Sequence, residues 1–187
     1  MESLAQYLDR LASISPTPGG GSAATIVGAL AAALVAMAAR ITAGNRTYAQ
    51  HEAAARRIAE QADALRAELL EASRRDEEAF AAVMASRGDA RQAALARAAA
   101  EPLDAMGLAL RVQRLAAQAL ELGNAHLASD LGVANELAAA ALAGSAYNVR
   151  VNHRAMRDEA LVASHVQRLE ALERESAALR LRRENLL

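Results

Sequence analysis

The segment from Ser22 to Ala39 constrains the fold of this chain most, because it runs for 18 residues without a charged side chain. A stretch of this length is either a membrane span or a helix that protein covers on all sides. Most of its residues are Ala and Gly, which contribute little to insertion into a bilayer. We therefore interpret it as a buried helix, and Gly28, Ala32 and Ala36, spaced four apart, permit close helix crossing.

Composition favours helices throughout the chain. Ala supplies 52 of the 187 residues, and aromatic side chains make up 2%. Strands favour β-branched and aromatic residues, whereas Ala is the strongest helix former, so an all-β protein is excluded. At this length we expect a single domain spanning residues 1–187.

Hydrophobic periodicity predicts an all-α bundle of five to seven helices. So few helices could hardly cover the uncharged helix in a monomer, so we also predict a homodimer. Ser22 is the expected N-cap of that helix, which should end near Ala43, and Ser129 is a candidate N-cap further along. Pro102 is expected to break or kink its helix. The remaining helices are expected over 4–14, 47–86, 89–122, 130–147 and 158–187.

Charge and residue usage exclude several functional classes. The formal net charge of -1 argues against nucleic acid or an anionic membrane as a partner. All 21 basic residues are Arg, so Schiff-base chemistry on Lys is excluded, and the absence of Cys excludes disulfides and thiol nucleophiles. The four His residues lack the spacing of metal ligands, so we predict neither a metal nor a tightly bound cofactor. Glu2 and Asp9 do not suit a secretory signal, so we expect a cytoplasmic location.

Asp76 is the most informative single residue. At about 100° per residue it falls on the same helical line as Leu69, Ala72, Phe80 and Val83. A carboxylate in an apolar stripe is costly unless it is paired or its pKa rises until it holds a proton near neutral pH. A general acid requires that second condition. The alternative is a buried ion pair with one of the many Arg residues.

Two further patterns suggest a binding site. The loop Gly19-Gly20-Gly21-Ser22 leads into a helix, so its N–H groups could converge on an anion, although such a sequence also forms tight turns. Asn148 and Asn152 share a helix face with small residues, which leaves room for a ligand or for hydrogen bonds between helices. Residues 148–152 alternate like a strand, but no partner strand is evident, so we predict a helix there. Asn124 and Asp130 flank a turn, where they could contact a ligand or simply cap a helix.

Together, these segments resemble the cyclodeaminase domain of formiminotransferase-cyclodeaminase and the related methenyltetrahydrofolate cyclohydrolases. The resemblance rests on SPTPGGGS at 15–22, GNRTY at 44–48, DEEAF at 76–80 and GSAYNVRVN at 144–152, together with Gly123-Asn124 and Ser129-Asp130-Leu131. These elements occur in the family's order and cover nearly the whole chain.

The resemblance implies a dimeric all-α enzyme of folate one-carbon metabolism, with Asp76 as the catalytic acid/base and a tetrahydrofolate derivative as substrate. The main prediction is conversion of 5-formiminotetrahydrofolate to 5,10-methenyltetrahydrofolate with release of ammonia. The alternatives are a methenyltetrahydrofolate cyclohydrolase and a helical dimer that binds folate or a partner without turnover. Arg46 is expected near the acidic glutamyl tail. The predicted substrate-binding residues are Gly19, Gly20, Gly21, Ser22, Arg46, Tyr48, Asn124, Asp130, Asn148 and Asn152.

Overall fold

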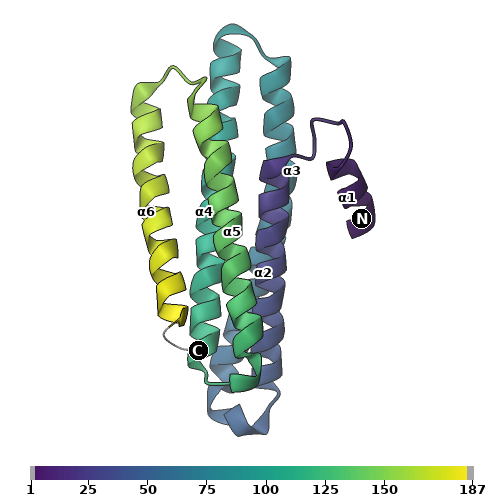
Figure 1. Ribbon diagram of the computed structural model, residues 1–187, viewed down its shortest axis with the longest axis vertical. Helices are drawn as coiled ribbons and strands as arrows, with labels where there is room; N and C mark the ends of the chain where they lie inside the picture. Colours follow the sequence, from purple (N-terminus) through teal and green to yellow (C-terminus); the bar gives the residue numbers. More distant parts are fainter. Residues whose placement is uncertain (1–2, 185–187) are drawn as a thin grey trace.

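The computed structural model describes residues 3–184, with side chains as far as Arg180, and this part of the chain is all-α (Figure 1). It contains six α-helices, within the predicted range of five to seven, and two short 3₁₀ turns. The elements are α1 (Leu4–Leu11), α2 (Gly20–Ala43), η1 (Arg46–His51), α3 (Glu52–Ala85), α4 (Gly88–Glu121), η2 (Ala125–Leu127), α5 (Ala128–His153) and α6 (Glu159–Glu184).

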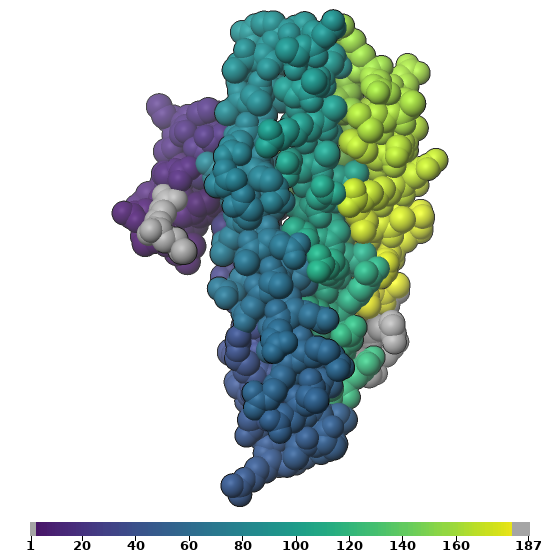
Figure 2. All heavy atoms as spheres, turned by 180° about the vertical axis from the view of Figure 1, so that it is seen from behind, coloured from purple at the N-terminus to yellow at the C-terminus, as the bar shows by residue number. Residues whose placement is uncertain are grey.

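Four long helices form the core. Helix α2 packs against α3 and α5, and α4 packs against the same two helices, while α6 covers the outer side of α4 and α5 (Figure 1). Helix α1 projects beside α3, away from the rest of the bundle (Figures 1 and 2), and none of its residues is buried. The short turns at each end make successive helices antiparallel, which brings the start of α2 beside the ends of α3 and α5.

Small residues allow α2 and α5 to cross closely. A Cβ placed on Gly28 would lie 3.4 Å from Cβ of Ala141, and one placed on Gly144 would lie 3.2 Å from Cβ of Ala24. Ala32 and Ala36 are also fully buried within the chain. The predicted close crossing is therefore confirmed, and it is made inside one chain.

Helix α2 has the length and apolarity of a membrane span, yet 13 of its 24 residues are buried in the bundle. The interpretation as a core helix is confirmed for the buried part of its surface, while Leu30, Met37 and Ile41 stay exposed in one chain. Its predicted N-cap is wrong, because the helix begins at Gly20 with Gly19 as its N-cap, and Ser22 lies inside the first turn. Gly20 and Gly21, expected in a loop, therefore belong to the helix.

Two other predicted boundaries also differ. Helix α4 continues through Pro102 without a break, and Pro102 and Leu103 are buried there. Ser129 does not cap α5, which begins one residue earlier, after the 3₁₀ turn. Residues 148–152 are helical, as predicted. The last helix follows Asp158, whose carboxylate accepts a hydrogen bond from Leu161 N at 2.9 Å, and its expected end at Leu187 lies outside the described residues.

Candidate functional site

A cavity of about 390 Å³ opens where the start of α2 meets α3, α4 and α5. The four segments that line it lie far apart in the sequence, and the antiparallel bundle brings them together. The cavity combines one carboxylate, one guanidinium and two amides with an apolar wall. Its lining residues are Pro16, Thr17, Gly19, Gly20, Gly21, Asp76, Phe80, Val83, Met84, Arg91, Leu95, Ala98, Asn148, Val151, Asn152 and Ala155.

Asp76 lies on the wall of this cavity, where the buried stripe of α3 opens. Leu69 and Ala72 precede it in the stripe and are buried, as is Val83 beyond it. Phe80, predicted on the same line, is 40% exposed and borders the cavity. The helical spacing therefore placed Asp76 correctly at an apolar face, which here ends in a hollow.

Burial raises the pKa of Asp76 above its ordinary value. The backbone N–H of Ser22 donates a hydrogen bond to the carboxylate, which opposes the rise in pKa, and the negative charges of Glu77 and Glu101 add to it. Among the described residues Asp76 forms no ion pair, so it is not the buried Asp–Arg pair considered as an alternative. A carboxyl group in these surroundings can hold a proton nearer to neutral pH and release it again.

Gly21 is required for the position of this carboxylate. A Cβ on Gly21 would overlap both carboxylate oxygens of Asp76. Gly20 faces the cavity instead, and a Cβ there would lie 4.0 Å from Nδ2 of Asn148. The start of α2 therefore approaches the chain's own carboxylate, and Ser22, the third helical residue, offers it one of the N–H groups that helix geometry leaves unpaired.

The side chain of Ser22 points away from the cavity. It is fully buried, and its hydroxyl lies 2.7 Å from Oγ of Ser73 and 2.9 Å from Oη of Tyr7 on α1. It also donates to Oε1 of Glu77 at 3.3 Å. Only the backbone of Ser22 therefore faces Asp76.

The two predicted amides both line the cavity but make different contacts. Asn148 Nδ2 donates to the carbonyl of Gly144 in its own helix at 3.1 Å. Asn152 Nδ2 donates across to the carbonyl of Ala98 at 2.8 Å. Ala98 is four residues before Pro102, which has no N–H to donate to it. Asn152 thus supplies the hydrogen bond that Pro102 leaves open, and this explains how α4 continues through the proline.

Arg91 is a cavity residue that the sequence analysis missed. It lies on α4 in line with Leu95 and Ala98, which are buried, and its Nη1 donates to the carbonyl of Val83 at 2.9 Å. The signal that identified Asp76, a charged residue in a buried stripe, also applies to Arg91. It gives the cavity a cation within reach of an acidic group on a ligand.

The remaining predicted residues lie at the opposite end of the bundle. Arg46 and Tyr48 belong to η1, which follows α2, and the 24 residues of α2 span about 36 Å. At that end Asn124 is buried and its Nδ2 donates to Oγ1 of Thr42 at 3.1 Å, while Asp130 is in the first turn of α5. Within one chain none of these four residues lines the cavity.

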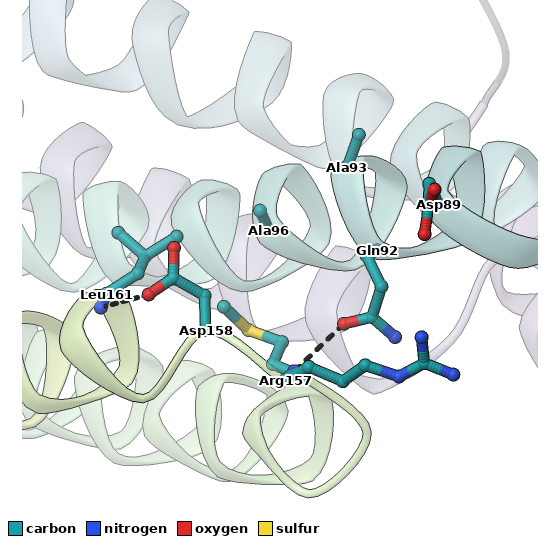
Figure 3. A pocket seen from close by; sticks show the side chains of 8 residues that line it. Asp89, Gln92, Ala93, Ala96, Arg157, Asp158 and Leu161 are labelled. Carbon is teal, nitrogen blue, oxygen red and sulfur yellow. Dashed lines mark hydrogen bonds between the residues drawn. The ribbon is translucent and has the colours of Figure 1, made fainter.

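A second groove, between the start of α4 and the turn from α5 to α6, lies next to the Asp76 cavity (Figure 3). In it, Gln92 Oε1 accepts a hydrogen bond from Arg157 N at 2.9 Å (Figure 3). Gln92 Nε2 also donates to the carbonyl of Ala155 at 3.1 Å. Ala155 lines the Asp76 cavity, so Gln92 fixes the turn after α5 against α4. In the described part of the chain, no three His, Asp or Glu side chains form a cluster suited to a metal ion.

Comparison with known proteins gives consistent matches over this whole architecture. The methenyltetrahydrofolate cyclohydrolase of Methylorubrum extorquens is 38% identical over 95% of this chain and 92% of its own length. The formimidoyltransferase-cyclodeaminase of Mus musculus is 31% identical over 93% of this chain, which spans only 35% of that longer protein. The crystal structure of a formiminotetrahydrofolate cyclodeaminase from Thermotoga maritima superposes with a TM-score of 0.96 at 32% identity, covering 100% of this chain and 96% of that one.

The family model described as formiminotransferase-cyclodeaminase matches residues 3–171, which include every cavity residue. The relatives named above are enzymes by name, and this chain shares its fold with the Thermotoga maritima cyclodeaminase. The family predicted from the sequence motifs is therefore confirmed: the chain belongs to the formiminotransferase-cyclodeaminase family and is an enzyme of the cyclodeaminase or cyclohydrolase kind.

Proposed function

We propose that the chain acts on the one-carbon unit that joins N5 and N10 of a tetrahydrofolate derivative, and that Asp76 is the catalytic acid/base. The observation that carries this proposal is the half-buried Asp76 carboxyl on the cavity wall, with a raised pKa and no ion-pair partner among the described residues. Both reactions known by name among the relatives need a group that moves protons beside this carbon.

We propose the cyclohydrolase reaction first, because the relative of that name matches over nearly the full length of both chains. Water attacks the bridging carbon of 5,10-methenyltetrahydrofolate, and the carboxylate of Asp76 takes one of its protons. The bond from this carbon to N5 then breaks as N5 gains a proton from Asp76. The product is 10-formyltetrahydrofolate, and one proton is released overall.

The cyclodeaminase reaction, which was the main prediction from sequence, is the second candidate. It is favoured by the structural likeness to the Thermotoga maritima enzyme of that name. Here N10 attacks the formimino carbon of 5-formiminotetrahydrofolate and loses its proton. The formimino nitrogen gains two protons, the one lost by N10 and one from solvent delivered through Asp76. The carbon–nitrogen bond to it then breaks, so that ammonia leaves and the methenyl cation remains.

The other cavity residues support binding of such a substrate. Gly20 leaves space beside Asn148, whose amide lies at the cavity wall. Arg91 offers a positive charge for the carboxylates of the glutamyl tail, in place of Arg46, which lies at the other end of the chain. These residues support a tetrahydrofolate derivative as the substrate. We also propose that the reaction takes place in the cytoplasm.

We also propose that the chain forms a homodimer. Apolar side chains of α2 remain exposed after the chain has folded, with Leu30, Met37 and Ile41 each more than a third exposed, and Leu70 of α3 is 42% exposed. A second copy covering this face would bury them. It is also the arrangement in which Arg46 and its neighbours could approach a cavity, namely that of the partner. Sedimentation at micromolar concentration tests this, and a compact 19.6 kDa species alone would contradict it.

The catalytic role is tested with Asp76→Asn. Each candidate substrate is supplied in turn, and formation or loss of methenyltetrahydrofolate is followed by its absorbance. We expect the preferred reaction to fall by about 10²–10⁴-fold. The melting temperature should stay equal or rise, because the neutral amide removes a costly buried charge.

Asp63→Asn is the matched control, because Asp63 lies on the same helix in an exposed ion pair with Arg40 and Arg66. It should keep wild-type turnover. Near-normal turnover in Asp76→Asn, or a wild-type protein that binds folate and turns over neither substrate, would contradict the proposal. The second result would favour the folate-binding dimer.

A further inference from the structure

A polar network centred on the buried side chain of Ser22 joins α1 to the residue whose backbone holds Asp76. Its centre is the Ser22 hydroxyl, which lies 2.9 Å from Tyr7 Oη, 2.7 Å from Ser73 Oγ and 3.3 Å from Glu77 Oε1. The other carboxylate oxygen of Glu77 accepts from Arg10 Nη2 at 2.9 Å. Helices α1, α2 and α3 therefore meet through these five side chains.

The donors in this network have one consistent arrangement. A serine hydroxyl has one proton and two lone pairs, and a carboxylate can only accept. Ser22 therefore gives its proton to Glu77, and the hydroxyls of Tyr7 and Ser73 both donate to Ser22. The chain of donors ends on Glu77, so its carboxylate orders the other groups.

Asp76 and Glu77 are consecutive residues that lie on opposite sides of the start of α2. Asp76 lines the catalytic cavity, whereas Glu77 and Tyr7 line a separate groove between α1, α2 and α3. Ser22 lies between them: its backbone N–H bonds to Asp76 and its hydroxyl bonds to Glu77. The two carboxylates are thus held through one buried residue.

This arrangement explains the position of α1. None of its residues is buried, so it adds little to the core. Its contacts with the bundle include two polar ones, from Tyr7 to Ser22 and from Arg10 to Glu77, and both end on this network. A capping box from Ser3 and Gln6 stabilises the short helix that presents them.

We propose that Glu77 is a positioning residue for Asp76, acting through Ser22, and that α1 fixes Glu77 in this place through Tyr7 and Arg10. The inference rests on the proposed catalytic role of Asp76. Glu77 has two effects on its neighbour: it orients Ser22, and it keeps a negative charge beside the Asp76 carboxyl.

The effect of the Glu77 charge on the Asp76 carboxyl can be measured. Among the described residues, the titratable and charged groups that act on Asp76 or line its cavity are Glu77 on its own helix, Glu101 and Arg91 on α4, and Tyr7 on α1. Glu101 is paired with Arg75 at 2.8 Å and Glu77 with Arg10 at 2.9 Å. Removing the charge of Glu77 should lower the pKa of Asp76, because one of the charges that favour its protonated form is lost.

The decisive variant is Glu77→Gln, with Glu78→Gln as its matched control. Glu78 is the next residue, it makes the same change of charge, and it is exposed and paired with Arg74. Two quantities are measured: the titration of the Asp76 carboxyl by ¹³C NMR, assigned with Asp76→Asn, and the pH dependence of turnover. In Glu77→Gln the pKa of Asp76 should fall by about 0.5–1 unit, and the pH–rate profile should move by the same amount.

At neutral pH we expect kcat of Glu77→Gln to fall about 3–10-fold with KM changed less than about twofold, because proton transfer is affected more than binding. Glu77→Asp should recover part of kcat, and Glu78→Gln should match the wild type. Tyr7→Phe removes one donor to Ser22 and should lower kcat about 2–5-fold. Its control, Tyr147→Phe, changes a tyrosine that is 72% exposed and should have no effect.

An unchanged Asp76 titration and pH–rate profile in Glu77→Gln would overturn the inference, even if Asp76→Asn is inactive and the proposed function stands. If Asp76→Asn stays active, the proposed function fails, and the NMR titration still decides whether Glu77 acts on Asp76. Should Glu77→Gln fail to fold, wild-type kcat in Tyr7→Phe would overturn the inference and reduced kcat with an intact fold would support it.

Discussion

Helix α2 contacts α3 through a glycine at two places, Gly21 and Gly28, and the two glycines have different roles. In the middle of the helix, a Cβ on Gly28 would meet the methyl groups of Leu69 at 3.1 and 3.3 Å. One heptad earlier, on the same face, a Cβ on Gly21 would overlap the carboxylate of Asp76. Leu69 is completely buried and cannot move away, whereas Asp76 borders a cavity and can. The same residue type therefore preserves packing at one position and a reactive group at the other.

The largest expected effect is that of Gly21→Ala on turnover. The new methyl group would force the Asp76 side chain to rotate away from Ser22 N–H, at little cost to the fold because the moving atoms are the end of a side chain facing a cavity. We expect turnover to fall by at least about 10²-fold, toward the value for Asp76→Asn. The melting temperature should change little, since Ala is also the better helix former.

Paired assays of rate and thermal unfolding check this prediction. Wild-type turnover in Gly21→Ala would show that the Asp76 carboxylate does not need its observed position. A large fall in melting temperature would show that this end of α2 is packed as tightly as the middle, and the contrast with Gly28 would disappear.

Asn152→Ala should have the next largest effect, on stability. It removes the hydrogen bond to the Ala98 carbonyl, which Pro102 leaves without its helical donor. An unsatisfied, part-buried carbonyl costs about 1–3 kcal/mol of unfolding free energy, so urea denaturation should show a loss in this range. Asn148→Ala, whose bond is to its own helix, should instead raise KM with little loss of stability.

A double-mutant cycle isolates the link between Asn152 and the proline. In a Pro102→Ala background the substituted alanine supplies the missing backbone N–H, so Asn152→Ala should cost less than in the wild type. Equal costs in both backgrounds would mean that Asn152 does not compensate for Pro102, and its place at the cavity wall would then need a role in binding.

Gly28→Ala should destabilise the fold by a smaller amount. Overpacking against buried Leu69 costs about 1–3 kcal/mol, and the better helix propensity of Ala returns up to about 1 kcal/mol. We expect a net loss of about 1 kcal/mol in urea unfolding, with turnover per folded molecule unchanged. A variant that loses activity while keeping its stability would place the middle of α2 in the site.

The sequence predicted those features that depend on one helix at a time. The absence of charge identified α2 as a core helix, periodicity identified the place of Asp76 in the stripe of α3, and local motifs identified the family. The features that were missed or wrong depend on two helices meeting. Gly20 and Gly21 belong to a helix, and Gly21 lies against Asp76 of α3. Asn152 of α5 donates to the Ala98 carbonyl that Pro102 leaves without a helical donor. The hydroxyl of Ser22 bonds to Tyr7 and Ser73 instead of capping α2.

The distance between sites could not be predicted either. Arg46 and Asn124 belong to motifs of the same family as Asp76, and sequence order alone grouped them with it. Arg46 and Asn124 lie at one end of α2 and Asp76 lies at the other. Only the folded bundle therefore shows that a single chain does not bring these residues together.

The smallest expected effect concerns the contact between α5 and α6, away from α2, where a partly buried charge affects stability and not turnover. His153 on α5 and His165 on α6 lie in hydrogen-bond distance, with Nε2 and Nδ1 3.2 Å apart. Burial is the main cause that lowers the pKa of both imidazoles. For His153, the charges of His165 and Arg150 lower the pKa further. A folded-state pKa below the unfolded value of about 6.5 favours the neutral form, so this contribution to stability is present above pH 6.5 or so and is lost as the pH falls below it.

Asp76 acts in the opposite direction, because its raised pKa makes the folded state bind its proton more tightly, and its cost to stability disappears as the pH falls through that pKa toward about 3.8. His165→Gln removes one of the two imidazoles that resist protonation in the folded state. It should reduce the loss of unfolding free energy between pH 7 and pH 5 by less than about 1 kcal/mol, since solvent screens the partly exposed His153–His165 pair. Urea denaturation at the two pH values measures it, with exposed His126→Gln as control. An unchanged pH dependence in His165→Gln would mean that the contact between α5 and α6 tolerates a charged imidazole, and the cost of charge in this protein would then be confined to the end of α2 that holds Asp76.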